Sequence, residues 1–194
     1  KIDKKMKRTA HRPIPSGRIS SKTATVVAAL FIVAGGASLL CISQNAYLIL
    51  VLGLCAAAWY NGVYYALKRL TAFAAVPGAV IGAIPPAMGW IAGGGEPTHP
   101  LCILLCTFVF LWQVPHFWLL MLKYGEEYKK AGYPSITSLY STRQIKNITF
   151  IWIFATAVTA LMLPMFDLVQ SWIVIAGMLV SSIWLIGTDR KSTR

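Results

Sequence analysis

The chain has 194 residues, of which 57% are hydrophobic and only 12% are charged. A soluble domain of this length does not need so much apolar surface, so the composition indicates a polytopic helical membrane protein. Alternating strands of about ten residues, which are typical of an outer-membrane barrel, are missing from the sequence. The net charge of +12 would suit nucleic acid, but the positions of the basic residues argue against such a partner.

Apolar segments of about 20 residues recur along the chain, each long enough to span a hydrocarbon core of about 30 Å as a helix. All 18 Lys and Arg residues lie in connections on one side of these segments, and the other connections contain none. Because basic loops stay inside, that side is predicted to be cytoplasmic, or the matrix in an organelle. The six segments are 23–43, 46–67, 73–93, 100–122, 147–166 and 168–187.

The first 22 residues form a basic loop, in which Pro13 and its neighbouring proline and glycine disfavour a long helix. One interpretation is a positive-inside loop that attracts phospholipid headgroups. The other is an anion site, in which Asp3 holds a divalent cation while Arg8 and Arg12 bind phosphate oxygens.

The second span ends in a polar and aromatic set, Asn61, Tyr64, Tyr65 and Lys68, whose helical spacing places them on or near one face. An interfacial aromatic belt with a basic anchor explains most of this set. Asn61 lies a turn or two deeper and fits that explanation less well.

The third span carries small residues four apart on both sides of Pro85-Pro86, including Gly78 and Gly82. Paired small residues favour close helix packing, and the double proline predicts a break or a kink.

The fourth span is interrupted by Pro115 and His116, a backbone break and a polar ring at membrane depth. Such groups are tolerated there only where protein or a water-filled cavity meets them, so this stretch predicts a cavity wall. The cavity is expected to open at the surface, where Lys123, Glu126 and Glu127 lie in a charged loop. The last two spans carry no such residues and are interpreted as scaffold.

Acidic residues from two loops of the same side, Asp3 together with Glu126 and Glu127, suit a hard divalent cation. Mg²⁺ is usually held by one or two carboxylates and by substrate phosphates, and nearby Arg and Lys would take the remaining phosphate charge. The combination favours a diphosphate carried on a lipid tail that lies among the helices.

Several motifs, in order along nearly the whole chain, resemble the haem O synthase (protohaem IX farnesyltransferase) family, a branch of the UbiA-type intramembrane prenyltransferases. The Trp-Gln-x-Pro-His-Phe block is the most specific of them and separates this branch from quinone-pathway relatives. The motifs are Asp3-x-x-Met6-x-Arg8-Thr9-x-x-Arg12-Pro13, Leu67-Lys68-Arg69-x-Thr71, Gly82-Ala-Ile-Pro-Pro-Ala-Met-Gly-Trp90, Trp112-Gln-Val-Pro-His-Phe117 and Glu126-Glu127-Tyr128-x-x-Ala-Gly132.

The resemblance implies an all-α transmembrane bundle of about nine helices around a central cavity, with six of them in this chain. Residues 1–194 are therefore expected to form a single prenyltransferase domain that is truncated at both ends and inactive alone. The family's first acidic motif is Asn-x-x-x-Asp-x-x-x-Asp, and Asp3 matches only its last residue. Glu126 and Glu127 match the family's second acidic pair, with Glu127 where Asp is usual.

The implied reaction is transfer of a farnesyl group from farnesyl diphosphate to a vinyl group of protohaem IX, with water adding a hydroxyl, and Mg²⁺ as cofactor. The implied catalytic residues are Asp3, His116, Glu126 and Glu127, of which the three carboxylates are also metal ligands. The expected diphosphate ligands are Arg8, Arg12, Lys68, Arg69 and Lys123, and the expected cavity wall is Asn61, Tyr64, Tyr65, Trp112 and Phe117.

The expected location is a bacterial inner (plasma) membrane, in preference to a mitochondrial inner membrane, with the active side cytoplasmic. Membrane lipid, and a downstream haem A synthase or terminal oxidase assembly, are the implied partners. Three alternatives stay open: a related prenyltransferase that acts on an aromatic or quinone precursor, a non-catalytic haem-binding membrane protein, and a transporter. The second would need paired axial ligands within the spans, where His116 is the only histidine. A transporter would favour an inverted repeat, and none is evident.

Overall fold

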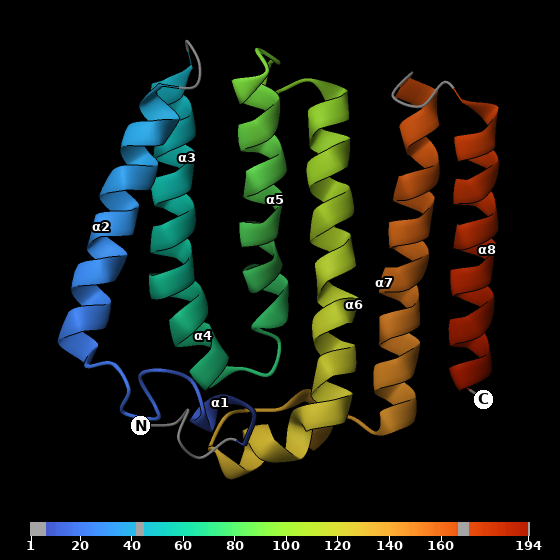
Figure 1. Ribbon diagram of the computed structural model, residues 1–194. Coiled ribbons are helices and arrows are strands. Elements are labelled where there is room, and N and C mark those ends of the chain that lie inside the picture. Colours follow the sequence, from blue (N-terminus) through green and yellow to red (C-terminus); the bar gives the residue numbers. More distant parts are fainter. Residues whose placement is uncertain (1–6, 42–44, 167–170, 194) are drawn as a thin grey trace.

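The computed structural model describes residues 7–41, 45–166 and 171–193, and within these ranges every regular element is a helix. The long helices lie side by side in chain order, each antiparallel to the next (Figure 1). A four-residue helix, α1 (Lys7–Ala10), precedes them. The long helices are α2 (Ser21–Leu40), α3 (Ala46–Ala58) continued by α4 (Tyr65–Leu70), α5 (Ala75–Ala92), α6 (Pro100–Lys130), α7 (Thr142–Met162) and α8 (Trp172–Thr193).

Within the described residues, each of the six predicted spans overlaps a helix. Five helical stretches are long and apolar enough to cross a membrane: Ser21–Leu40, Ala46–Leu70, Ala75–Ala92, Pro100–Lys130 and Thr142–Phe166. In α8 the described apolar part is shorter, Trp172–Trp184. The protein is an integral membrane protein, and the all-helical prediction is confirmed.

The loops that follow α1, α4 and α6 lie at one end of the bundle, together with the last turns of α8 (Figure 1). These are the connections that carry the basic residues. The one-sided placement predicted from the charge pattern is therefore the arrangement in the structure. We call this end of the bundle the basic end.

A small core connects α5, α6 and α7 close to the basic end. Its members come from α5, α6, α7 and the short 3₁₀ turn Ile136–Ser138, and the indole of Trp118 makes edge-to-face contacts with Phe73 and Trp152. This packing fixes α5 and α6 against each other where they form the cavity described below. The fully buried residues of the core are Ala79, Val114, Trp118, Ile136 and Ile145.

Two expectations about helix continuity are wrong. The break expected at Pro85 and Pro86 is absent, since α5 runs continuously through both, and the contacts with α3 and α6 hold the helix in place; the expected kink stays a prediction. α6 does not stop near residue 122 but continues to Lys130, so Glu126 and Glu127 lie on a helix and not in a loop.

The longer α6 has a clear physical reason. Its last turns contain Glu and Lys, which favour helix, and Gly125 is accommodated because it packs directly against Thr137. The helix ends where Gly132 adopts a positive φ of 85°. The N–H of Tyr133 then donates to the Tyr128 carbonyl and that of Gly132 to the Lys129 carbonyl, a Schellman ending.

Candidate active site

A cavity of about 580 Å³ lies between α4, α5 and α6 and opens near the basic end. Its mouth is lined by residues of the N-terminal loop, α4 and the end of α6, among them Thr9, Arg12, Lys68, Tyr128 and Tyr133. Its deeper part is lined by α5, α6 and the turn before α4, among them Tyr64, Gly78, Gly82, Gln113 and Phe117. The cavity thus has a cationic mouth and an apolar, aromatic interior.

Lys68 supplies a half-buried positive charge at this mouth. Its Nζ lies 4.4 Å from the ring centroid of Tyr65, 5.7 Å from that of Tyr133 and 6.0 Å from that of Tyr64. Aromatic faces attract a cation and restrict where its side chain can go. The lysine is therefore positioned at the mouth by the residues around it.

Two other predicted diphosphate ligands point elsewhere. The guanidinium of Arg69 lies 4.3 Å from the Tyr65 ring centroid and donates to the Tyr65 hydroxyl. Lys123 is exposed, with its Nζ 5.3 Å from the Tyr124 ring centroid. Neither side chain lines the cavity, nor does Tyr65, whereas Lys68 does.

A π-helical turn, Trp59–Tyr64, determines which residues of this crossing face the cavity. The N–H of Tyr65 donates to the carbonyl of Tyr60, five residues back, and the indole N–H of Trp59 donates to the Pro77 carbonyl on α5 over 2.9 Å. Tyr60 and Tyr64 line the cavity, but Asn61 is exposed and donates to Ala57 of its own helix. The predicted common face therefore holds only for Tyr64 and Lys68.

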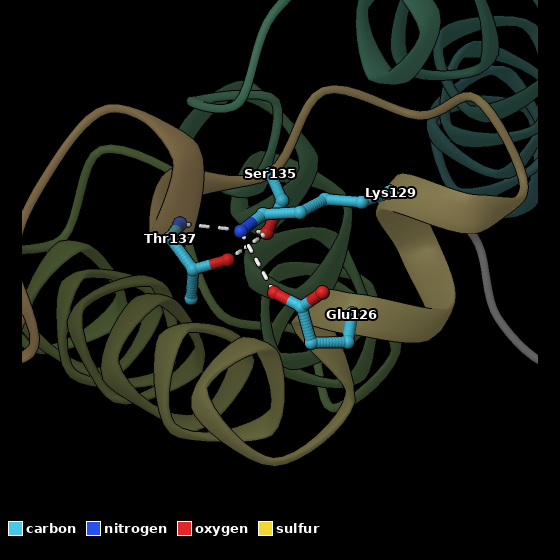
Figure 2. A network of polar contacts seen from close by, with 4 residues as sticks. All are labelled: Glu126, Lys129, Ser135 and Thr137. Atoms are coloured by element: carbon cyan, nitrogen blue, oxygen red, sulfur yellow. Dashed lines mark hydrogen bonds and ion pairs between the residues drawn. The ribbon is translucent and has the colours of Figure 1, made fainter.

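The acidic pair at the end of α6 is split between two environments. Glu126 is 75% exposed and forms an ion pair with Lys129 over 2.8 Å, beside the hydrogen-bonded Ser135 and Thr137 (Figure 2). Glu127 is half-buried, and its Oε2 is buried without a hydrogen-bond partner in the described part of the chain. Glu127 is thus the carboxylate with a free acceptor in a partly desolvated position.

His116 and Trp112 stack on each other, with ring centroids 5.6 Å apart and planes at 16°. Both side chains are exposed on α6, and neither lines the cavity, so the expectation that His116 faces this cavity is wrong. The reason is helical register: Gln113 and Phe117, one residue further along from each, turn toward the cavity. Phe117 lies between the cavity and the exposed face that carries His116, since the ring centroids of Phe117 and His116 are 6.2 Å apart.

Asp3 lies outside the described residues, and so does the Arg8 side chain. The described residues contain no group of three His, Cys, Asp or Glu that could hold a metal ion by themselves. The residues that sequence reasoning missed are Gln113, Tyr128, Tyr133 and the cavity-lining glycines. Gln113 could have been predicted as a cavity residue from the sequence, because a carboxamide in the middle of an apolar span needs a polar neighbour just as His116 does.

Comparison with known sequences decides the family. The UbiA prenyltransferase family matches residues 1–192, which is nearly the whole chain. The chain belongs to the UbiA prenyltransferase family. This membership confirms the resemblance carried by the motifs and accords with the polytopic helical structure.

Curated UbiA relatives share more than the family. A protoheme IX farnesyltransferase of Nitratidesulfovibrio vulgaris is 39% identical over 172 residues, which cover 89% of this chain and 59% of the relative. One of Geobacter sulfurreducens is 40% identical over 167 residues, covering 86% and 61%. One of Acaryochloris marina is 37% identical over 192 residues, covering 95% and 55%. The chain therefore spans about three-fifths of the length of these relatives. No solved structure matches the chain.

Proposed function

We propose that this UbiA protein transfers a farnesyl group from farnesyl diphosphate to a vinyl group of protohaem IX, forming haem O. The similarity to relatives named protoheme IX farnesyltransferase supports this acceptor. The observation that carries the proposal is the cavity between α4, α5 and α6, which has a cationic mouth and an apolar depth. A substrate with a diphosphate head and a long hydrocarbon tail has the same distribution of charge.

The diphosphate head is assigned to Lys68 and Arg12. Both line the mouth, and both can donate charge-assisted hydrogen bonds to phosphate oxygens. Their positive charge would stabilise the negative charge that develops on diphosphate as the allylic carbon–oxygen bond breaks. The basic loops at this end support a cytoplasmic mouth in a bacterial inner membrane.

Mg²⁺ is the cofactor that this chemistry calls for, and Glu127 suits it. The carboxylate presents a buried oxygen without a hydrogen-bond partner among the described residues, an arrangement that is unfavourable until a cation or donor meets it. Asp3 is the second carboxylate that we propose, and Glu126 is the weaker candidate because Lys129 already neutralises it. When bound, the ion would neutralise diphosphate charge together with Lys68 and Arg12.

The farnesyl tail is assigned to the deeper part of the cavity. Tyr64 and Phe117 present aromatic surfaces there, and the missing side chain at Gly78 leaves the space that the Tyr64 ring occupies. An apolar and aromatic lining excludes bulk water, which would otherwise capture the electron-deficient allylic carbon.

The porphyrin is assigned to the exposed face of α6 that carries Trp112 and His116. Indole and imidazole already stack there, and flat aromatic surfaces suit a flat macrocycle. His116 would act as a ligand to haem iron or as a positioning group near the vinyl. Phe117 lies between this face and the cavity, which is where the two substrates would have to meet.

The test is reconstitution in lipid of this protein at its complete natural length, with farnesyl diphosphate, Mg²⁺ and protohaem IX. We expect haem O, detected by chromatography and mass spectrometry, and no prenylated product when an aromatic acid replaces haem. Prenylation of the aromatic acid with no haem product would instead assign the protein to the quinone-pathway branch.

A further inference from the structure

The deep end of the cavity determines how long a hydrocarbon tail the cavity can take. Of the described residues that line the cavity, Pro85 lies deepest on α5 and Gln113 lies deepest on α6. The two helices are antiparallel, so higher residue numbers on α5 and lower numbers on α6 both lead away from the mouth (Figure 1). Pro85 and Gln113 therefore mark the floor of the tail pocket.

Gln113 closes the gap between the two helices at this floor. A methyl group on Gly82 would overlap the Gln113 carboxamide, and the three nearest atoms that it would meet all belong to that side chain. The carboxamide thus packs directly on the backbone of α5, in a space that exists because residue 82 has no side chain. A long side chain on α6 and a missing one on α5 together form the floor.

The depth of this pocket matches the length of a farnesyl tail. From Ala75, at the start of α5 near the mouth, to Pro85 at the floor, the helix rises about 15 Å. Each isoprene unit adds about 5 Å to an extended chain, so the three units of a farnesyl tail measure about 15 Å. A tail of four units would measure about 20 Å and would extend beyond Gln113.

We propose that Gln113, packed against Gly82, limits the prenyl tail to three isoprene units and so selects farnesyl diphosphate over longer prenyl diphosphates. This inference rests on the proposed function and identifies a specificity-determining residue within it. A geranylgeranyl tail would have to displace the carboxamide or fold back inside the pocket, and forcing extra atoms into a packed site is unfavourable. A geranyl tail would leave the floor unfilled and lose the burial of one unit.

Three variants separate size from polarity at the floor. Gln113→Ala removes the side chain that closes the gap, whereas Gln113→Met keeps its length without the carboxamide. In the Gln113→Ala background, Gly82→Ala adds a methyl group at the position that the carboxamide occupied, so it refills part of the space. Thr107→Ala is the control, because Thr107 is exposed on α6 and does not line the cavity.

The experiment measures the affinity of each variant, at the complete natural length of the protein, for farnesyl and geranylgeranyl diphosphate by calorimetry in lipid nanodiscs. The ratio of the two affinities is the readout, since a general loss of stability or of diphosphate binding would lower both alike. In Gln113→Ala we expect the preference for farnesyl diphosphate to fall by about tenfold or more, the scale on which apolar pockets distinguish chain length. Gln113→Met and Thr107→Ala should keep the wild-type ratio, and the double variant should recover part of it.

An unchanged ratio in Gln113→Ala would overturn the inference, because another residue would then limit the tail. An equal fall in Gln113→Met would also overturn it, since polarity and not size would then decide the preference. Failure of Gly82→Ala to restore any preference would contradict a limit at this position. The binding assay contains no haem, so a wild type that prefers farnesyl diphosphate but forms no haem O would count against the proposed function and not against this inference.

Discussion

The ring of Tyr64 lies directly against Gly78, so that a methyl group at Gly78 would come within 2.8 Å of two ring atoms. Because Tyr64 lines the cavity, this contact links the packing of α5 to the shape of the substrate site. We expect Gly78→Ala to displace the tyrosine, to destabilise the protein by about 1–3 kcal/mol and to weaken farnesyl diphosphate binding.

Gly89→Ala is the matched control for that change. Gly89 lies on the same helix, and a Cβ there would meet nothing within 4 Å. The substitution should be neutral or stabilising by about 0.5–1 kcal/mol, because alanine favours helix over glycine. Thermal unfolding in detergent and calorimetry measure both variants, and equal behaviour of the two would contradict the role of the Tyr64 contact.

Lys68 should be the cation that matters most for the diphosphate. Lys68→Met removes its charge and should lower farnesyl diphosphate affinity by about tenfold to a hundredfold, the effect of losing a charged hydrogen bond worth about 1.5–3 kcal/mol. Lys22→Met removes a charge from the exposed start of α2, away from the cavity, and should leave the affinity unchanged. The measurement is titration at two salt concentrations, and equal losses in both variants would reduce Lys68 to part of a general basic surface.

The two glutamates should differ although they are adjacent. Glu127→Gln removes a charge from the half-buried carboxylate while nearly preserving its shape, and turnover and its Mg²⁺ dependence should fall strongly. Glu126→Gln should have a smaller effect, because that carboxylate is exposed and paired with Lys129. Unchanged turnover and Mg²⁺ dependence in Glu127→Gln would show that Glu127 is only a surface charge.

His116→Ala should separate the two substrates. We expect it to abolish haem farnesylation while farnesyl diphosphate binding stays nearly intact, because the diphosphate is assigned to Lys68 and Arg12 at the cavity mouth and His116 does not line this cavity. Chromatography for haem O and calorimetry for diphosphate affinity are run on the same variant. Normal haem O formation would leave His116 as a packing partner of Trp112, and loss of both activities would point to misfolding.

The orientation in the membrane can be tested without any substrate. A cysteine at position 96, before α6, and one at position 130, at its end, should be labelled from opposite sides of oriented vesicles. α6 has 31 residues and is long enough to separate them by a bilayer. Background labelling of the exposed Cys41 and Cys55 is removed by substituting both with serine. Labelling of both engineered cysteines from one side would contradict the topology.

The sequence predicted the membrane crossings because long apolar segments and one-sided charge depend only on the bilayer. It also predicted Lys68, Tyr64 and Phe117 as residues of one site, and all three line the cavity. It failed where the helical register decides the outcome. His116 was expected to face the cavity, but its neighbours Gln113 and Phe117 do.

The end of α6 shows a second physical limit of sequence reasoning. Charged residues after an apolar span indicate a membrane surface, but they do not tell where the helix stops. Gly125 would ordinarily weaken a helix, yet the absence of a side chain there lets Thr137 pack close, and the helix continues to Lys130. Such tertiary compensation is not visible in the local sequence.

The π-helical turn at Trp59–Tyr64 changes which side chains of a single membrane crossing face the cavity after it. Each residue advances an α-helix by about 100°, so deleting one residue from α4 between this turn and Lys68, such as Ala66, would rotate Lys68 by roughly a quarter of a turn, away from the diphosphate. The span would remain just as hydrophobic and long enough to cross the membrane, and it would insert normally. In α2, where no described side chain is buried, the same deletion would merely exchange one lipid-facing residue for another. In the crossing that contains Lys68, the number of residues therefore determines where a substrate-binding side chain points. In α2 it determines little more than the length of the span.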